Sequence, residues 1–306
     1  MSVLIVGAGA AGGYLGAQLD DAGRDVTFLV HQSSRDRLAA EGLRLRQGDR
    51  TRTVRVDAVT ADDLSGPYDV VVIAVRAGVV ANAIADVRPA VGSDTRVVPI
   101  MNGLDHLVLL TEAFGRTRVL GAATRLVTSQ RPDGMIDVVQ PGVHMEIGAL
   151  DGDDAAAMQR TAAELSAPDI EVAVRDDIIA AMWEKFAFIA ATAVLTCLVG
   201  DEIGPIVRAD GGEELSRSVQ AEVVAVADAD GYPLRDVFTS RLRGIMTDPA
   251  SAFGPSMFRD MHAGRPIEVT VLRDLAGRAR RRRLSTPLLD AALVRIDVHN
   301  RGLAAA

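Results

Sequence analysis

Residues 2–13 read SVLIVGAGAAGG, and this stretch decides the fold class of the chain. Its first five residues form a short apolar run that is typical of a buried strand, and an apolar helical pattern follows the glycines as far as Leu19. The glycines have the spacing GxGxxG. In this strand–turn–helix setting Gly7 allows a tight turn, Gly9 lets the backbone approach a pyrophosphate, and Gly12 lets the helix pack closely. We therefore predict a dinucleotide-binding α/β domain at the amino terminus.

The start of the helix after the glycines is the predicted phosphate-binding element. Its free amides and the positive end of its dipole can hold phosphate groups. The predicted cofactor-binding residues of this turn are Gly7, Ala8, Gly9, Ala10, Ala11 and Gly12. The alternative is a glycine-rich turn that binds no ligand.

The end of the second predicted strand, Asp25–Val30, bears on the choice of cofactor. Sites that prefer NAD place an Asp or Glu there, which bonds the ribose 2′-hydroxyl. No carboxylate stands at this tip of the strand, whereas four polar side chains there can reach a 2′-phosphate: His31, Ser33, Ser34 and Arg35. The pattern favours NADP(H), and the alternative is a solvated polar loop.

The rest of the first half continues to alternate strands with helices. A helix is predicted from Val79 to Val87, and the predicted strands are Leu43–Arg46 and Thr53–Val56, paired as a hairpin, then Asp69–Val75 and Arg96–Ile100. The segment from Gly134 to Leu150 is interpreted as a hairpin around Gln140-Pro141-Gly142 that closes the domain.

Two loops are predicted at the ligand-binding edge of this sheet, because ligands of an open doubly wound sheet lie beyond the carboxyl ends of its strands. They are Arg76-Ala77-Gly78 and Met101-Asn102-Gly103. The amide of Asn102 can donate to a carbonyl or ribose oxygen, so this residue is a candidate for contact with substrate or cofactor. Its alternative role is that of an Asn-Gly turn former.

From about Pro168 onward the strand signals stop and helical periods take over. Asp176-Asp177 can cap a helix whose apolar stripe includes Met182 and Ile189, and further helices are predicted over Glu213–Asp230 and Asp236–Thr247. We expect a domain boundary here, with an α/β domain over residues 1–168 and an all-α domain over residues 169–306.

Lys185 is the single lysine of a chain whose other basic side chains are all arginine. Lysine can give up its proton and arginine effectively cannot. Lys185 lies on the apolar stripe between Met182 and Ile189, where desolvation favours the neutral amine and eases proton release. We interpret it as a proton donor; the alternatives are a chance survivor of compositional drift and a lysine that extends its amine to solvent at the edge of the stripe.

Glu268 is the second candidate catalytic group. Pro266 suits the first position of a helix, which would place Glu268 in the first turn, where the helix dipole keeps a carboxylate ionised. A purely structural first-turn acid is the alternative. The run Arg280 to Arg283 is interpreted as a solvated helix end.

Composition excludes several classes of protein. The net charge of −8 reflects an excess of acidic over basic side chains. It argues against a general nucleic-acid binder or a binder of acidic membranes. The single cysteine, Cys197, permits neither an internal disulfide nor a cysteine-based metal site, which fits a reducing compartment. The amino terminus reads as a strand rather than a signal peptide, and the apolar stretch Phe186–Val199 is short for a membrane span. We expect a cytoplasmic protein with no metal.

The combined motifs resemble the ketopantoate reductase (2-dehydropantoate 2-reductase) family over essentially the whole chain. The marks are the turn Gly7 to Gly12, Asn102-Gly103 after the fifth strand, Trp183-Glu184-Lys185-Phe186 at the start of the helical domain, and Ser256-Met257 twelve residues before Glu268. The resemblance implies a Rossmann domain for NADPH, a helical substrate and dimerisation domain, a 2-keto acid substrate and a place in pantothenate biosynthesis. It also implies that Lys185 is the general acid, that Asn102 binds substrate or cofactor, and that Ser256 and Glu268 hold the substrate.

Several positions depart from the family pattern. Residues Ile189, Ala193 and Phe253 stand where the family often has asparagines, while Arg76 replaces a usual lysine and His31 a usual arginine. Apolar groups in place of three amides predict a drier pocket with fewer hydrogen bonds to a polyhydroxylated substrate. A site that hydrogen-bonds a substrate hydroxyl rejects analogues without it far better than an apolar site rejects extra groups. We therefore predict a reductase that prefers a bulkier or more apolar keto acid, ketone or imine over ketopantoate. The alternatives are a non-catalytic NADP-binding regulatory protein and an interaction protein that dimerises through its helical half.

Overall fold

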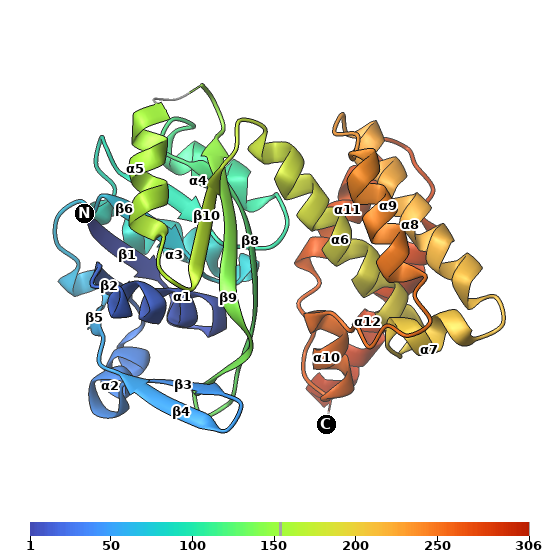
Figure 1. Cartoon of the computed structure of the whole chain (residues 1–306), viewed down its shortest axis with the longest axis horizontal. Helices are drawn as coiled ribbons and strands as arrows, with labels where there is room; N and C mark the ends of the chain where they lie inside the picture. The colour runs from blue at the N-terminus through green and yellow to red at the C-terminus, as the bar shows by residue number, and fades with distance from the viewer. Residues whose placement is uncertain (153–154, 306) are drawn as a thin grey trace. The chain divides into compact units, whose positions relative to one another are not determined.

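The structure is a computed structural model that describes residues 1–152 and 155–305. Its contacts divide the chain into two compact units, Met1–Ala181 and Met182–Ala306 (Figure 1). The sequence analysis places the boundary between residues 168 and 169, ahead of a strand, β10 (Ile170–Val174), that belongs to the first unit. The expectation that strands stop at Pro168 was therefore wrong, because β10 is a short segment that pairs with a distant strand.

The first unit contains an all-parallel sheet with the strand order β5-β2-β1-β6-β7. These strands are β1 (Ser2–Val6), β2 (Asp25–Leu29), β5 (Asp57–Val59), β6 (Val70–Ile73) and β7 (Arg96–Pro99). In chain order this is third, second, first, fourth, fifth, the doubly wound order of a Rossmann fold. The order reverses between β1 and β6, so a crevice for a ligand is expected at their carboxyl ends. The predicted fold class is confirmed; within this sheet, β5 is the strand that the sequence analysis missed.

Side chains of β1 alternate between two hydrophobic cores, one on each face of the sheet. Val3 and Ile5 pack in a cluster with α1, whereas Leu4 and Val6 pack in a cluster with α3 and α4. The helices of this unit are α1 (Ala10–Asp21), α2 (Gln32–Glu41), α3 (Val80–Val87), α4 (His106–Phe114) and α5 (Ala155–Leu165). Burial on both faces explains why β1 and β6 are continuously apolar.

A second sheet has the order β10-β9-β3-β4, with β8 paired to β9 (Figure 1). Its remaining strands are β3 (Leu43–Gln47), β4 (Arg50–Val54), β8 (Leu120–Gln130) and β9 (Ile136–Ala149). The predicted hairpin of β3 and β4 is confirmed. The predicted hairpin around Gln140-Pro141-Gly142 was wrong, because these residues lie inside the single strand β9, whose antiparallel partner is β8.

A local irregularity explains how β9 passes through a Pro-Gly pair without turning. The register between β8 and β9 shifts next to Val127, which faces Gln140. Pro141 has no N–H to donate to the ladder, and the amide of Gly142 donates instead to the hydroxyl of Tyr14 on α1, at 3.0 Å. Gly142 has φ +92°, which suits glycine. Turn residues therefore formed a bulge rather than a turn.

In the part of the second unit that the structure describes, the regular elements are helices joined by loops. Its helices are α7 (Ile203–Arg208), α8 (Gly212–Ala229), α9 (Asp236–Met246), α10 (Ser256–His262), α11 (Thr270–Arg281) and α12 (Pro287–Ala305), preceded by α6 (Ile178–Val199), which starts in the first unit. By length and composition α6 could cross a membrane, but 67% of its apolar window is buried, as in the core helix of a globular domain. The run Arg280 to Arg283 is a solvent-exposed helix end, as predicted.

Candidate functional site

The glycine turn after β1 has the backbone that its spacing predicts. Gly7 has φ +98°, its amide donates to the carbonyl of Leu29 at 3.0 Å, and a Cβ on it would lie 2.9 Å from the carbonyl oxygen of Ala74. A side chain at Gly7 would therefore clash with the loop after β6. The backbone of Gly7 therefore lies close to that of Ala74, just after β6, at the point where the strand order reverses.

Gly12 and Gly9 differ in what a side chain would meet. A Cβ on Gly12 would overlap the carbonyl oxygen of Gly7 and lie 2.7 Å from Cβ of Ala74, so this glycine serves close packing of α1. Around Gly9, which caps the start of α1, the nearest atom to such a Cβ is Oε1 of Gln130, at 3.9 Å. The open side of Gly9 together with the helix amides fits a pyrophosphate.

Arg76 and Asn102 follow β6 and β7, the two strands next to β1 on one side. Because these strands are parallel, their carboxyl ends share one edge of the sheet with the glycine turn. Both side chains are exposed, and Gly103 after Asn102 has φ +84°. The first unit thus brings the predicted turn, Arg76 and Asn102 to one edge.

The tip of β2 carries His31, which is exposed and caps the start of α2 with its backbone. Arg35 lies one turn into the same helix, and its guanidinium pairs with Asp63 at 2.5 Å. The tip itself lacks a carboxylate, but the 3₁₀ turn after β5 supplies one next to Arg35. Sequence spacing could not reveal Asp63, because it belongs to a different strand–turn segment.

Lys185 is half-buried on α6. The residue before it, Glu184, keeps only 13% of its side chain exposed and accepts two hydrogen bonds of 2.6 Å from Arg235. The predicted helix over this stretch and its apolar stripe are confirmed, since Met182 is buried and Ile189 half-buried on the same helix. Both neighbours of Lys185 in the chain, Glu184 and Phe186, are fixed by packing or pairing.

Trp183 is a second anchor of this turn of α6. Its ring is buried and stacks on Tyr232 at 5.6 Å between centroids, and the guanidinium carbon of Arg278 lies 5.1 Å from the ring centroid. Arg278 in turn pairs with Asp274 at 2.7 Å and Asp230 at 2.6 Å. Burial alone would lower the pKa of Arg278, but the hydrogen bonds that its guanidinium donates to the two carboxylates, and their negative charge, outweigh burial and raise that pKa. Arg278 is therefore a permanent cation over the indole ring.

Glu268 does not lie in the first turn of a helix, so that prediction was wrong. Helix α11 begins at Thr270, with Val269 as its cap. The side chain of Asn300 on α12 accepts from the amide of Ile267 at 2.8 Å and donates to its carbonyl at 2.9 Å. This clamp uses the backbone N–H and C=O of Ile267, and residues 265–269 lie outside any helix, so Pro266 does not start one. The Glu268 side chain is exposed.

Ser256 is the first residue of α10 and is exposed. Three residues earlier, Phe253 packs edge-on against Phe188 of α6, with 5.4 Å between the ring centroids. Within the second unit Lys185 thus lies on α6, Ser256 at the start of α10 and Glu268 in the loop before α11. The Phe253–Phe188 contact ties the loop before Ser256 to the helix of Lys185. Asn300 and Phe188 are the residues that the sequence analysis missed, and only their contacts distinguish them.

Two family models match the chain, and together they cover most of it. Ketopantoate reductase PanE/ApbA matches residues 3–152, and the carboxy-terminal domain model of the same family matches residues 177–299. The chain belongs to the ketopantoate reductase PanE/ApbA family. It is accordingly an oxidoreductase, and the recognition made from the motifs is confirmed.

Several known proteins resemble this chain along most of its length. Oxidoreductase YkpB of Bacillus subtilis is 28% identical over 98% of this chain and 99% of its own. The 2-dehydropantoate 2-reductase of Mesorhizobium japonicum is 26% identical over 89% of both chains. Among solved structures, D-mandelate dehydrogenase with NADH and anilino(oxo)acetate has a TM-score of 0.87 at 17% identity and covers 99% of this chain and 100% of its own. The 2-dehydropantoate 2-reductase of Geobacter metallireducens has a TM-score of 0.84 at 24% identity, with 97% and 99% coverage. These structures share the fold.

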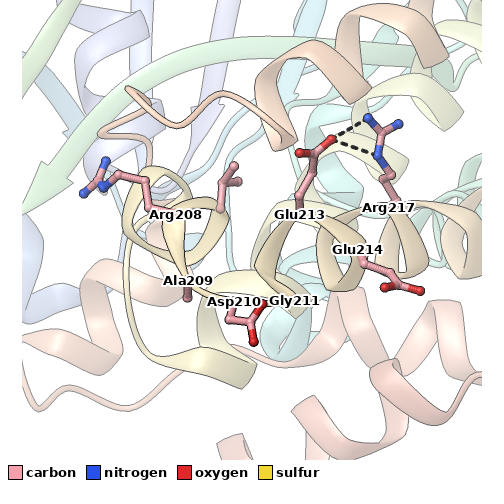
Figure 2. Close-up of a pocket in the computed structure, with 8 residues that line it drawn as sticks. Arg208, Ala209, Asp210, Gly211, Glu213, Glu214 and Arg217 are labelled. Carbon is pink, nitrogen blue, oxygen red and sulfur yellow. Dashed lines mark hydrogen bonds and ion pairs between the residues drawn. The ribbon is translucent and has the colours of Figure 1, made fainter.

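The surface of this ketopantoate reductase-family protein also has a hollow of about 550 Å³ where α7 meets α8 (Figure 2). An ion pair between Glu213 and Arg217 lies on its rim. The residues that line it are Val207, Arg208, Ala209, Asp210, Gly211, Glu213, Glu214 and Arg217. None of the predicted site residues is among them, so the hollow is separate from the residues discussed above.

Proposed function

We propose that the protein is an NADPH-dependent reductase of the ketopantoate reductase type, which transfers a hydride to the carbonyl of a 2-keto acid or a related substrate. The observation that carries the proposal is the placement of the only lysine. Lys185 is half-buried on α6, directly after a buried tryptophan anchor and a glutamate held by Arg235. In a chain that otherwise uses arginine for its basic groups, this side chain is the one suited to giving up a proton.

The glycine turn is the proposed cofactor site. Gly7 and Gly12 shape it, the open side of Gly9 leaves room for a pyrophosphate, and the amides at the start of α1 supply donors. When bound, the nicotinamide cofactor supplies the hydride. His31, Ser33, Ser34 and Arg35 are the proposed contacts for a 2′-phosphate, although Asp63 competes for Arg35. Arg76 is a further proposed cofactor-binding residue. Since the structurally similar D-mandelate dehydrogenase binds NADH, the preference of this protein for NADPH over NADH should be measured directly.

Lys185 is the proposed general acid. Negative charge develops on the carbonyl oxygen as the carbonyl carbon is reduced, and the Lys185 ammonium stabilises that charge and delivers a proton to the oxygen. Glu268 is the second proposed catalytic-site group; its carboxylate accepts a hydrogen bond from a substrate hydroxyl and so fixes orientation. The Ser256 hydroxyl and the Asn102 amide are proposed to donate to the substrate, and Asn102 also to the cofactor.

The substrate is proposed to be bulkier or more apolar than ketopantoate. Phe253 packs against Phe188, Ala193 is buried and Ile189 half-buried, so three positions that are often amides in the family are apolar here. A structural neighbour, D-mandelate dehydrogenase, binds anilino(oxo)acetate, whose anilino group is aromatic. We therefore place aromatic and branched 2-keto acids first in a substrate panel, with ketones and imines after them. Reduction of ketopantoate, with a role in pantothenate biosynthesis, is the second proposal.

A panel of carbonyl compounds, followed by NADPH absorbance, tests the proposal. It includes ketopantoate, phenyl- and branched-chain 2-keto acids, and imines, each with NADPH and NADH, for the wild type and Lys185→Ala. We expect turnover by the wild type and a rate lower by about 10²–10⁴-fold in the variant, at unchanged cofactor affinity. Tight NADPH binding without turnover of any substrate would instead support a regulatory protein.

Assembly and location complete the proposal. Ketopantoate reductase of Staphylococcus aureus is dimeric, and we propose a homodimer for this chain, to be checked by its mass in sedimentation. We propose a cytoplasmic enzyme that acts on a small molecule and binds neither nucleic acid nor membrane.

A further inference from the structure

Gln130, the last residue of β8, lies beside the glycine turn although the two are far apart in the chain. Its side-chain Nε2 is 3.4 Å from the carbonyl oxygen of Ala8 and 3.4 Å from that of Gly134. The hairpin of β8 and β9 therefore reaches back to the amino-terminal end of α1. Neither the glycine motif nor the composition of β8 predicts this contact.

The side of Gly9 that lacks a Cβ is the side that faces a bound pyrophosphate in this fold, because the second glycine of the motif permits the close approach of the cofactor. The atom nearest to that missing Cβ is Oε1 of Gln130, at 3.9 Å. The Gln130 amide therefore borders the space that the phosphates would occupy.

The backbone of Gln130 is fixed, while its amide group is held loosely. Gln130 pairs with Ile136 across the hairpin, and Arg131 next to it donates from its amide to the carbonyl of Met135 at 2.9 Å. In contrast, N–H···O distances of 3.4 Å lie beyond the usual range for a strong hydrogen bond. Since the side chain is exposed, the amide can rotate and exchange a carbonyl for another acceptor without burying an unpaired group.

Charged groups near Gly134 complete the surroundings. The guanidinium of Arg37 on α2 lies directly against Gly134, where a Cβ would overlap it. Asp133, the nearby carboxylate, pairs with Arg44 at 3.6 Å, and Asp137 pairs with Arg46 and Arg131. The acids around the hairpin turn are thus neutralised by arginines, which leaves Arg37 to favour an anion.

We propose that Gln130 is a cofactor-binding residue, whose side-chain amide donates a hydrogen bond to the pyrophosphate of the dinucleotide. A rotation of the terminal amide turns one N–H of Nε2 away from the Ala8 carbonyl toward the open side of Gly9, while the second N–H keeps the Gly134 carbonyl as its acceptor. The inference rests on the proposed function, since it requires a dinucleotide at the glycine turn. It assigns to the second sheet a direct part in closing that site.

The test is the NADPH dissociation constant, measured by calorimetry for the wild type, Gln130→Ala and Gln130→Glu. We expect about 10-fold weaker binding for Gln130→Ala, because a hydrogen bond to a charged group is lost. Gln130→Glu should bind more weakly still, because a carboxylate would face the phosphates. Gln140→Ala, an exposed glutamine of β9, is the matched control and should bind as the wild type does. Melting temperatures of all four proteins should agree.

The outcomes separate this inference from the proposed function. Wild-type binding with both Gln130 variants within twofold of it would overturn the role of Gln130 and leave the proposed function intact. A wild type that binds neither NADPH nor NADH would overturn both. A third outcome would also overturn the inference, because it would show a structural role. In it, Gln130→Ala binds NADPH more weakly but has a lowered melting temperature as well, and Gln130→Glu binds NADPH no more weakly than Gln130→Ala does.

Discussion

Arg235 holds Glu184 through two hydrogen bonds of 2.6 Å, at the residue directly before Lys185. The Glu184 side chain is 13% exposed and that of Arg235 is 52% exposed, so a solvent-facing arginine neutralises a nearly buried carboxylate. The pair joins α6 to the start of α9, because Arg235 caps that helix. Together with the stacked ring of Trp183 it fixes the helical turn that carries the proposed general acid.

Arg235→Ala is expected to destabilise the protein by about 1–2 kcal/mol, because a largely buried carboxylate loses its hydrogen-bonding partner while one end of the pair stays in solvent. Urea unfolding measures the change. Arg241→Ala, on the exposed side of the same helix α9, is the matched control and should change the free energy of unfolding by less than about 0.5 kcal/mol. Equal effects of the two substitutions would show that the pair with Glu184 contributes nothing specific.

Lys185→Arg separates positive charge from proton transfer. Arginine keeps the charge but cannot release its proton at neutral pH, so the rate of carbonyl reduction should fall by about 10²–10⁴-fold, as for Lys185→Ala. The affinity for NADPH should stay unchanged in both variants. Single-turnover kinetics with the best substrate of the panel gives the comparison. Near wild-type rates for Lys185→Arg would mean that the residue acts only through its charge.

Gly9→Ala and Gly12→Ala should fail in different ways. A Cβ on Gly9 meets no atom closer than 3.9 Å, so this variant should keep its melting temperature and bind NADPH at least about 10-fold more weakly. A Cβ on Gly12 would overlap the Gly7 carbonyl, so this variant should lose about 1–3 kcal/mol of stability. Thermal melts and calorimetry of both variants check the contrast. A stable Gly12→Ala with full affinity would contradict it.

Phe253→Asn restores an amide at a position that is often an asparagine in the family. It also removes the edge-on contact with Phe188. We expect the ratio of kcat/KM for ketopantoate to kcat/KM for a phenyl 2-keto acid to rise by about 10-fold, since one new hydrogen bond and one lost apolar contact act in the same direction. Initial rates with both substrates give the ratio. An unchanged ratio at unchanged stability would place Phe253 away from the substrate.

Asp230→Asn should destabilise the protein in a pH-dependent manner. Burial tends to raise the pKa of Asp230, but the hydrogen bonds from Arg278 and Arg282 outweigh it, and its pKa is lowered. A lowered carboxyl pKa stabilises the folded state above the unfolded-state value of about 3.9 and loses that effect as the pH falls through the folded value. We expect a difference of about 1–3 kcal/mol between wild type and variant at pH 7, which shrinks as the pH falls below about 3.9 and through the lowered pKa of Asp230 in the folded state. Urea unfolding at several pH values measures it.

Much of the fold could be predicted because it depends on local patterns. The buried strand Ser2–Val6, the glycine turn and the helix of Lys185 are each determined by residues within a few positions of one another, and all three are confirmed. The predicted hairpin around Pro141-Gly142 and the predicted helix start at Pro266 were wrong. Both rest on local turn or helix-start signals that a distant partner overrides, Tyr14 for Gly142 and Asn300 for Ile267.

By itself the sequence determined the doubly wound α/β class of the first half, the helical second half and the family. It also singled out Lys185, the one lysine of the chain, as the proposed general acid. Spacing is sufficient for these features because turns, strands and helices repeat over a few residues. Only the tertiary structure decided that Gln130 borders Gly9, that Asp63 pairs with Arg35, and that Asn300 clamps the backbone beside Glu268. Each of these is a contact between polar groups that chain folding brings together from separate elements, and no periodicity in the sequence records which elements meet.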